Sequence, residues 1–208
     1  MKINEDNNIP DCKVTLIGDS GVGKSSLISR YISGIFVDQM ESSSSASYSQ
    51  KEYEVNGKKV RLNIWDTAGQ EKFLSLTRNF YKDAVIIILV YDITNRQSFE
   101  DLKNIWYPEI QKYGEKTKIL AIVGNKSDLY EEEVITETEL LSLSEELGGI
   151  NFLVSAKNGN GIELMFKILA EKFLNPDFQD TIENRSTFRD RVASVRLEDT
   201  FNKKEKCC

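Results

Sequence analysis

The hydrophobic residues of the chain fall into short runs that alternate with longer segments of helical periodicity. Strand-length runs, mostly rich in Val, Ile and Leu, lie at 12–17, 60–65, 85–91, 119–124 and 151–154. They lack the polar alternation of a half-exposed strand, which indicates strands that are covered on both faces of a parallel sheet. The clearest helix is predicted at 161–174, where apolar residues recur at helical spacing.

One predicted pair of strands is antiparallel. Segments 48–55 and 58–64 flank Asn56-Gly57, and Asn-Gly between two strands is a strong signal for a tight hairpin. The chain therefore predicts an α/β fold with a mixed, mostly parallel six-stranded sheet and helices on both faces. We expect residues 1–10 to be a flexible N-terminus, 11–174 to form the domain, and 175–208 to form a flexible tail.

Composition narrows the classes of function. The 208 residues carry a net charge of −6, which argues against nucleic acid as the main partner. The absence of histidine excludes histidine metal sites and histidine-based nucleophile relays. Three cysteines are too few and too poorly spread for a disulfide framework, so we expect a reducing compartment. The first ten residues lack a signal-peptide core, and the longest apolar run, 85–90, is too short to span a bilayer.

A phosphate-binding loop is predicted at 18–25, where GDSGVGKS fits the pattern GxxxxGK[ST] directly after a strand. Its glycines let backbone N–H groups surround phosphate oxygens at the positive end of a helix. Lys24 would reach the β- and γ-phosphates, and the Ser25 hydroxyl would ligate Mg2+. The expected phosphate-binding residues are Ser20, Gly21, Val22, Gly23, Lys24, Ser25 and Ser26.

A base-binding motif follows the strand at 119–124, in the sequence Asn125-Lys126-Ser127-Asp128. A carboxylate only accepts hydrogen bonds, so Asp128 can pair with the two neighbouring donors of guanine but not with adenine. This favours guanine over adenine and counts against an ATP-using enzyme. The segment Ser155-Ala156-Lys157, after another strand, completes the predicted set.

A third motif, Asp66-Thr67-Ala68-Gly69-Gln70, ends the strand that begins at Val60. Asp66 can hold Mg2+ through water, Gly69 can offer its backbone N–H to a γ-phosphate, and Gln70 can orient the attacking water. We therefore predict Gln70 and Lys24 as the catalytic residues.

Together these motifs resemble the small GTPases of the Ras superfamily over roughly 11–174, and among them Rab proteins. The Rab-like segments are WDTAGQEKF at 65–73, NFYKDA at 79–84, LVYDIT at 89–94 and the cysteines at 207–208. The resemblance implies bound Mg2+ with GTP or GDP, slow GTP hydrolysis, and effector binding by the GTP form. It also implies that Phe36 packs edge-on against guanine, Lys126 covers the other face, and the Ala156 N–H meets guanine O6.

Cys207 and Cys208 resemble the paired cysteines of Rab proteins that accept geranylgeranyl groups. Two such chains anchor stably where one is marginal, because each buried CH2 contributes about 0.8 kcal/mol. The tail's basic and acidic residues balance, so the lipid would carry the membrane affinity. By resemblance we expect a lipid-anchored protein on the cytoplasmic face of intracellular membranes, with a cytosolic pool. Expected partners are effectors, an exchange factor, a GTPase-activating protein, an escort protein and a GDP-dissociation inhibitor.

The serine-rich stretch ESSSSASYSQ at 41–50 departs from the Rab pattern. Counting from Ser25 and from Trp65 places the Rab Mg2+-binding threonine at Ser43, which keeps the hydroxyl but lacks the methyl group. We interpret the stretch as a looser switch that closes less completely on GTP, since closing a loop costs roughly 1–2 kcal/mol per ordered residue. Two alternatives stay open: a membrane-tethered guanine-nucleotide-binding scaffold with impaired switching, and a small GTPase of the Ras or Rho kind.

Overall fold

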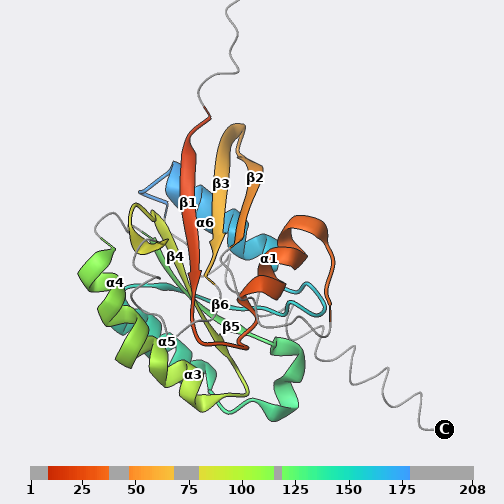
Figure 1. Ribbon diagram of the computed structural model, residues 1–208, viewed down its shortest axis with the longest axis vertical. Coiled ribbons are helices and arrows are strands. Elements are labelled where there is room, and N and C mark those ends of the chain that lie inside the picture. The colour runs from red at the N-terminus through yellow and green to blue at the C-terminus, as the bar shows by residue number, and fades with distance from the viewer. Residues whose placement is uncertain (1–8, 38–46, 68–79, 115–118, 179–208) are drawn as a thin grey trace, which may run out of the picture. The chain divides into compact units, whose positions relative to one another are not determined.

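A six-stranded mixed sheet forms the centre of the fold, in the order β2-β3-β1-β4-β5-β6 (Figure 1). The computed structural model describes residues 9–37, 47–67, 80–114 and 119–178. The strands are β1 (Asp11–Ile17), β2 (Ser47–Val55), β3 (Lys58–Asp66), β4 (Ile86–Asp92), β5 (Ile119–Asn125) and β6 (Ile150–Leu153). Only β2 and β3 are antiparallel among these strands, so the predicted mixed sheet is confirmed.

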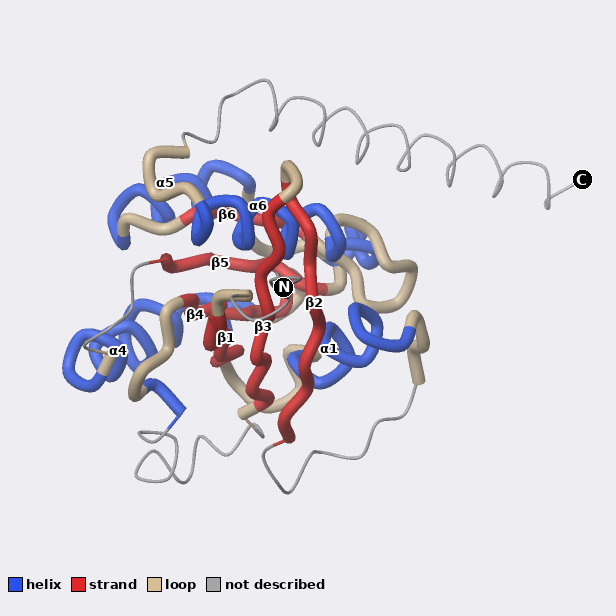
Figure 2. Tube along the Cα trace, turned by 90° about the horizontal axis from the view of Figure 1, so that it is seen from above, coloured by secondary structure: helices blue, strands red, loops and turns tan. Residues whose placement is uncertain are grey.

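The hairpin forms where Asn-Gly predicted it. Asn56 and Gly57 both have positive φ, of 52° and 75°, as a tight two-residue hairpin turn requires. The two strands pair without interruption from Val55 opposite Lys58 to Ser47 opposite Asp66. Figure 2 shows β2 at one edge of the sheet with β3 beside it. This pairing carries Asp66 to the edge at which β1 ends.

Helices surround the sheet within the described residues. They are α1 (Lys24–Ser33), α3 (Arg96–Asp101), the π-helical turn η3 (Leu102–Trp106), α4 (Tyr107–Tyr113), the 3-10 helix η4 (Ser127–Glu132), α5 (Glu137–Leu147) and α6 (Ile162–Leu174). The predicted helix at 161–174 is thus α6. None of the described helices combines the length and the apolar character needed to cross a bilayer.

Every residue of β4 is buried, because helices cover both of its faces. Ile87, Leu89 and Tyr91 belong to the core cluster under α3, η3 and α5. The alternate residues point to the opposite face, where the rings of Tyr31 from α1 and Phe166 from α6 stack with centroids 3.7 Å apart. The continuous apolar run at 85–91 is therefore the signature of a doubly covered strand, as predicted.

Candidate nucleotide-binding site

The segment between β1 and α1 forms a tight loop against the carboxyl ends of β4 and β5. Gly18 and Gly23 have φ of 147° and 93°. A Cβ atom on Gly18 would lie 2.1 Å from the Val90 carbonyl oxygen, and one on Gly23 would lie 2.4 Å from Asn125 Nδ2. Only glycine fits at either position. The loop therefore runs directly into the N-terminus of α1, where backbone N–H groups favour anions such as phosphate.

Lys24, the first residue of α1, points its ammonium group back into this loop. Its side chain is buried, and Nζ donates to the carbonyl oxygens of Gly18 and Asp19, both at 2.6 Å. These bonds hold a positive charge inside the loop that also contains Ser20, Gly21 and Val22. Ser25 and Ser26 follow in the first turn of the helix.

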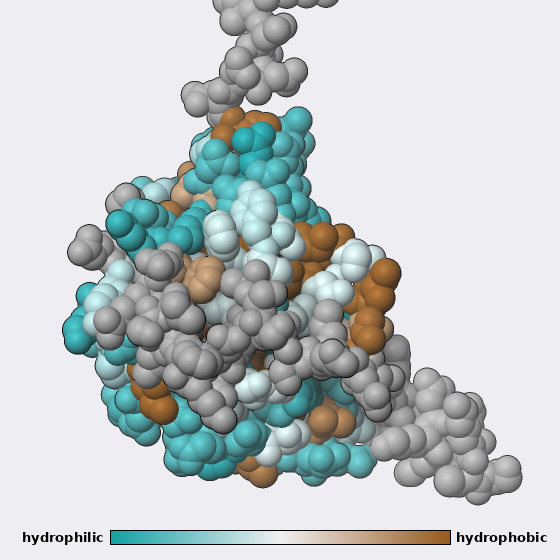
Figure 3. Space-filling model, viewed as in Figure 1, coloured by the Kyte–Doolittle hydropathy of each residue, from teal (hydrophilic) through white to brown (hydrophobic). Residues whose placement is uncertain are grey.

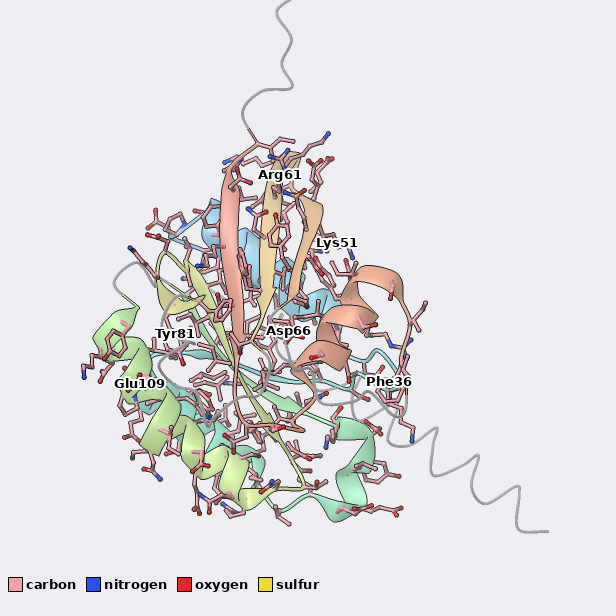
Figure 4. The ribbon with its side chains drawn as sticks, viewed as in Figure 1. Phe36, Lys51, Arg61, Asp66, Tyr81 and Glu109 are labelled. Atoms are coloured by element: carbon pink, nitrogen blue, oxygen red, sulfur yellow. The ribbon has the colours of Figure 1, made fainter. Side chains whose placement is uncertain are left out.

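Asp66 is buried at the end of β3 (Figure 4). It pairs in register with Leu16 of β1, just before the phosphate-binding loop begins. Burial raises the pKa of Asp66, while a hydrogen bond from Ser25 and the charge of Lys24 oppose that rise. Its Oδ1 atom is buried and has no hydrogen-bond partner among the described residues. A buried carboxylate oxygen beside a serine hydroxyl and a phosphate-binding loop fits a hard divalent cation with oxygen ligands.

Asn125, at the end of β5, joins three segments that are distant in sequence. The side chain is buried, with Nδ2 donating to the Val22 carbonyl oxygen at 2.8 Å and Oδ1 accepting from the Ala156 N–H at 3.1 Å. One amide thus connects the phosphate-binding loop, the 125–128 motif and the 155–157 segment. The predicted motifs lie side by side at one edge of the sheet.

Asp128 is oriented by Ser155, whose hydroxyl donates to Asp128 Oδ1 at 2.5 Å. The backbone supports this contact, since the Ser127 N–H donates to the Val154 carbonyl oxygen at 3.0 Å. A fixed carboxylate is what a bidentate contact to a base requires. The Ala156 N–H already donates to Asn125, so its predicted bond to guanine O6 requires that the two acceptors share it or that it changes partner.

Sequence reasoning missed Arg30, in the last turn of α1. Its Nε donates to the Ala156 carbonyl oxygen at 2.8 Å, and an Nη2 hydrogen bond reaches the Lys157 carbonyl oxygen. The same guanidinium lies 5.9 Å from the ring centroid of half-buried Phe36, which follows α1 (Figure 4). Arg30 therefore links Phe36, one predicted wall of the base pocket, to the 155–157 segment, a role that its place near a helix end does not reveal.

A second missed contact ties the phosphate-binding loop to the helix that follows β4. Trp106 is buried in η3, where the Tyr107 N–H reaches the Leu102 carbonyl oxygen across five residues. The Trp106 indole N–H donates to Asp19 Oδ1 at 2.7 Å. Burial raises the pKa of Asp19, the Trp106 bond lowers it, and the neighbouring Asp101 carboxyl raises it further. The phosphate-binding loop is thus held by Trp106 as well as by Asn125.

The structure gathers most of the predicted site residues at this edge. Lys126 and Lys157 lie in the same two segments as Asp128 and Ala156. Five predicted site residues lie outside the described residues: Ser43, Gly69, Gln70, Cys207 and Cys208.

Comparison with known proteins decides the family of this site. The model of the Ras family matches residues 13–175. The chain belongs to the Ras family. The predicted resemblance and the predicted P-loop α/β fold are both confirmed, and as a Ras-family GTPase the chain is a GTP hydrolase.

Within the Ras family, several Rab proteins are similar to this chain. Ras-related protein Rab-19 of Xenopus laevis is 40% identical over 163 residues, which is 78% of this chain and 76% of the relative. Rab-26 of Rattus norvegicus is 38% identical over 86% of this chain and 70% of its own length. Rab-30 of Homo sapiens is 38% identical over 83% and 84% respectively. This Ras-family chain is therefore Rab-like, and the family implies a bound guanine nucleotide.

Proposed function

We propose that this Rab-like GTPase is a membrane-attached switch of vesicle trafficking, which binds effectors in its GTP form and releases them after hydrolysis. The Asn125 amide carries the proposal, because it holds the phosphate-binding loop and the two base-side segments in one site. We infer that residues 11–174 form the GTP-binding domain and that 175–208 form its membrane-attaching tail.

The phosphates and Mg2+ would be held at the loop end of the site. Backbone N–H groups of 20–26 bind the phosphate oxygens, and Lys24 reaches the β- and γ-phosphates. The Ser25 hydroxyl, Ser43 and Asp66, which acts through water, would hold Mg2+, and the unpaired buried oxygen of Asp66 supports this assignment. When bound, Mg2+ neutralises negative charge on the phosphates.

The base would be held between the Phe36 ring and the Lys126 stem. Asp128 accepts the two neighbouring donors of guanine, with Ser155 fixing its rotation. Asn125 and Ala156 hold the floor of the pocket, and Lys157 continues the segment that Arg30 anchors. Adenine presents a lone pair where guanine presents N–H, so the pocket discriminates against ATP.

Hydrolysis would depend on Gln70, which orients the attacking water, and on the Gly69 N–H, which meets the γ-phosphate. Lys24 stabilises charge that develops on the phosphates. Intrinsic turnover is slow and rises when a GTPase-activating protein completes the site. An exchange factor, an escort protein and a GDP-dissociation inhibitor would serve the rest of the cycle.

Effectors would contact an aromatic surface formed by Tyr48, Trp65 and Phe80. The Tyr48 and Trp65 ring centroids lie 5.1 Å apart, those of Trp65 and Phe80 lie 6.0 Å apart, and Tyr48 is half exposed. Further large exposed hydrophobic side chains, Ile32 and Ile35, lie at the end of α1, the side on which Figure 3 shows an apolar area. Exposed aromatic and aliphatic side chains of this kind suit a protein partner.

Attachment would follow geranylgeranylation of Cys207 and Cys208, which would bring the protein to the cytoplasmic face of an intracellular membrane. Treatment of purified protein with Rab prenylation enzymes and geranylgeranyl diphosphate, followed by liposome flotation, tests this. We expect the treated wild type to float and a Cys207→Ser/Cys208→Ser variant to stay at the bottom. Equal flotation of both proteins would reject the lipid anchor.

The serine-rich stretch favours one second candidate, a scaffold that binds guanine nucleotide without switching. Ser43→Ala separates the two functions. A switch loses the difference between its GTP and GDP forms in effector binding, whereas a scaffold keeps the same binding as the wild type.

A further inference from the structure

Asp92 lies at the base-binding edge of the sheet, although no motif for nucleotide binding includes it. It is the last residue of β4 and pairs in register with Asn125 of β5. Its carboxylate is nearly buried, and Oδ2 lies 2.5 Å from Lys126 Nζ. An acid from one strand thus holds the lysine that follows the neighbouring strand.

The other carboxylate oxygen of Asp92 has a different task. Oδ1 accepts from the Thr94 N–H at 2.9 Å and from the Thr94 hydroxyl at 2.8 Å, which closes a local turn after β4. Oδ1 therefore makes a structural contact, and Oδ2 makes the contact with Lys126. This division allows the two roles to be tested separately.

Lys126 is constrained along its backbone as well. Its φ of 66° is left-handed, a conformation that lysine adopts at a cost and that tends to persist at functional sites. The side chain is about one-third exposed, whereas that of Asp92 is 10% exposed. The long, flexible and partly exposed side chain of Lys126 is thus held at its ammonium end by a fixed acid, which restricts the path of its aliphatic stem.

We propose that Asp92 is a positioning residue for guanine binding, which holds Lys126 so that its stem forms one wall of the base pocket. This inference rests on the proposed function, in which Lys126 covers one face of the base. Without Asp92 the ammonium is released to solvent, and the wall must be reordered each time a nucleotide binds. The free-energy cost of this reordering weakens nucleotide binding, and we expect it to appear as faster nucleotide release.

Asp92→Asn is the selective variant. Asparagine keeps an acceptor for the Thr94 turn, since both Asp and Asn form such turns, but it removes the charge that holds Lys126. Thr94→Val is the matched structural variant, because it weakens the Oδ1 turn and leaves Oδ2 in place. Glu146→Gln is the remote control, because Glu146 also pairs with a lysine, Lys103, at 2.6 Å but on the surface.

The experiment measures the rate at which the full chain releases fluorescent GDP in Mg2+ buffer, with the urea unfolding midpoint of each variant. We expect about tenfold faster release from Asp92→Asn, the order expected for loss of a charge-assisted contact. Thr94→Val should lower the unfolding midpoint without changing release, and Glu146→Gln should match the wild type. Combining Asp92→Asn with Lys126→Met should release GDP no faster than Lys126→Met alone, because both act through one group.

Three results would overturn the inference. They are a wild-type release rate in Asp92→Asn, an effect of Thr94→Val on release as large as that of Asp92→Asn, and full additivity with Lys126→Met. If the wild type holds GDP tightly in these cases, the proposed function stands and only the positioning role fails. A wild type that does not retain GDP would overturn the base-site assignment and this inference with it.

Discussion

Replacing Gly23 with alanine tests the contact that joins the phosphate-binding loop to the base side of the site. Gly23 has φ of 93°, and an added Cβ would lie 2.4 Å from Asn125 Nδ2. Gly148, after α5, is the matched control, because its φ of 69° is also left-handed but nothing lies within 4 Å of an added Cβ. Both variants bear backbone strain, and only Gly23→Ala also displaces Asn125.

The expected magnitudes follow from those two contributions. Left-handed strain costs roughly 1–2 kcal/mol for a non-glycine residue, which is the full cost at Gly148. At Gly23 the Asn125 amide must also move, which breaks its bonds to Val22 and Ala156. A buried polar group left unpaired costs about 1–3 kcal/mol. We expect this additional penalty of about 1–3 kcal/mol to weaken GDP binding, which is equivalent to about 5- to 150-fold in GDP affinity.

Two assays read this penalty. Urea unfolding of the full chain should show a lower midpoint for both variants, with the larger fall in Gly23→Ala. Titration with fluorescent GDP should show wild-type affinity in Gly148→Ala and strongly weakened affinity in Gly23→Ala. If the two variants lose GDP affinity equally, the Asn125 contact does not hold the site together and the reasoning is wrong.

Three further predictions concern other contacts of the fold. Arg30→Lys keeps the charge but loses the planar guanidinium that bonds to the 156–157 carbonyls. GDP release should therefore be roughly 3- to 10-fold faster in a fluorescence assay. An unchanged rate would reject the role of Arg30. Asp66→Asn should reduce the acceleration of GDP release that EDTA causes in the wild type, and an equal acceleration would remove Asp66 from the Mg2+ site. Hydrogen bonds from Arg96 and Thr136 lower the pKa of Glu139 to about 2 from its usual 4.5. Stability from a lowered carboxyl pKa is present above the unfolded value and lost as pH falls. The urea midpoint of Glu139→Gln should therefore lie below that of the wild type at pH 7, and the difference should shrink as the pH falls from about 4.5 through 2. A difference as large at pH 2 as at pH 7 would contradict the assignment.

Much of the fold could be predicted because local patterns agree with tertiary structure. The run at 85–91 is continuously apolar because helices cover both faces of β4, and Asn56-Gly57 takes the two positive φ values that its hairpin turn needs. The motifs at 18–25 and 125–128 could also be predicted to lie close together, since each follows a strand and the carboxyl ends of parallel strands meet at one edge of the sheet.

The contacts that brace the site could not be predicted in the same way. Arg30 lies 126 residues before Ala156 in sequence, and Trp106 lies 87 residues after Asp19. In the sequence, Arg30 is an arginine near a helix end and Trp106 is an aromatic residue at helical spacing. Solvent exposure and core packing explain such residues equally well, so neither pattern indicates a contact with the site. The π-helical turn at Leu102–Trp106 has no simple sequence signature, although Pro108 lies just beyond it and lacks the N–H that a regular helix uses.

Single-turnover hydrolysis tests the central claim, that the site binds GTP and switches by hydrolysing it. Wild type and a Gln70→Leu variant are loaded with GTP and Mg2+, and the conversion to GDP is followed over time. We predict slow conversion in the wild type that Gln70→Leu suppresses. Tight GTP binding with no conversion in the wild type, or equal conversion in the variant, would contradict the account of this chain as a switch driven by its own hydrolysis.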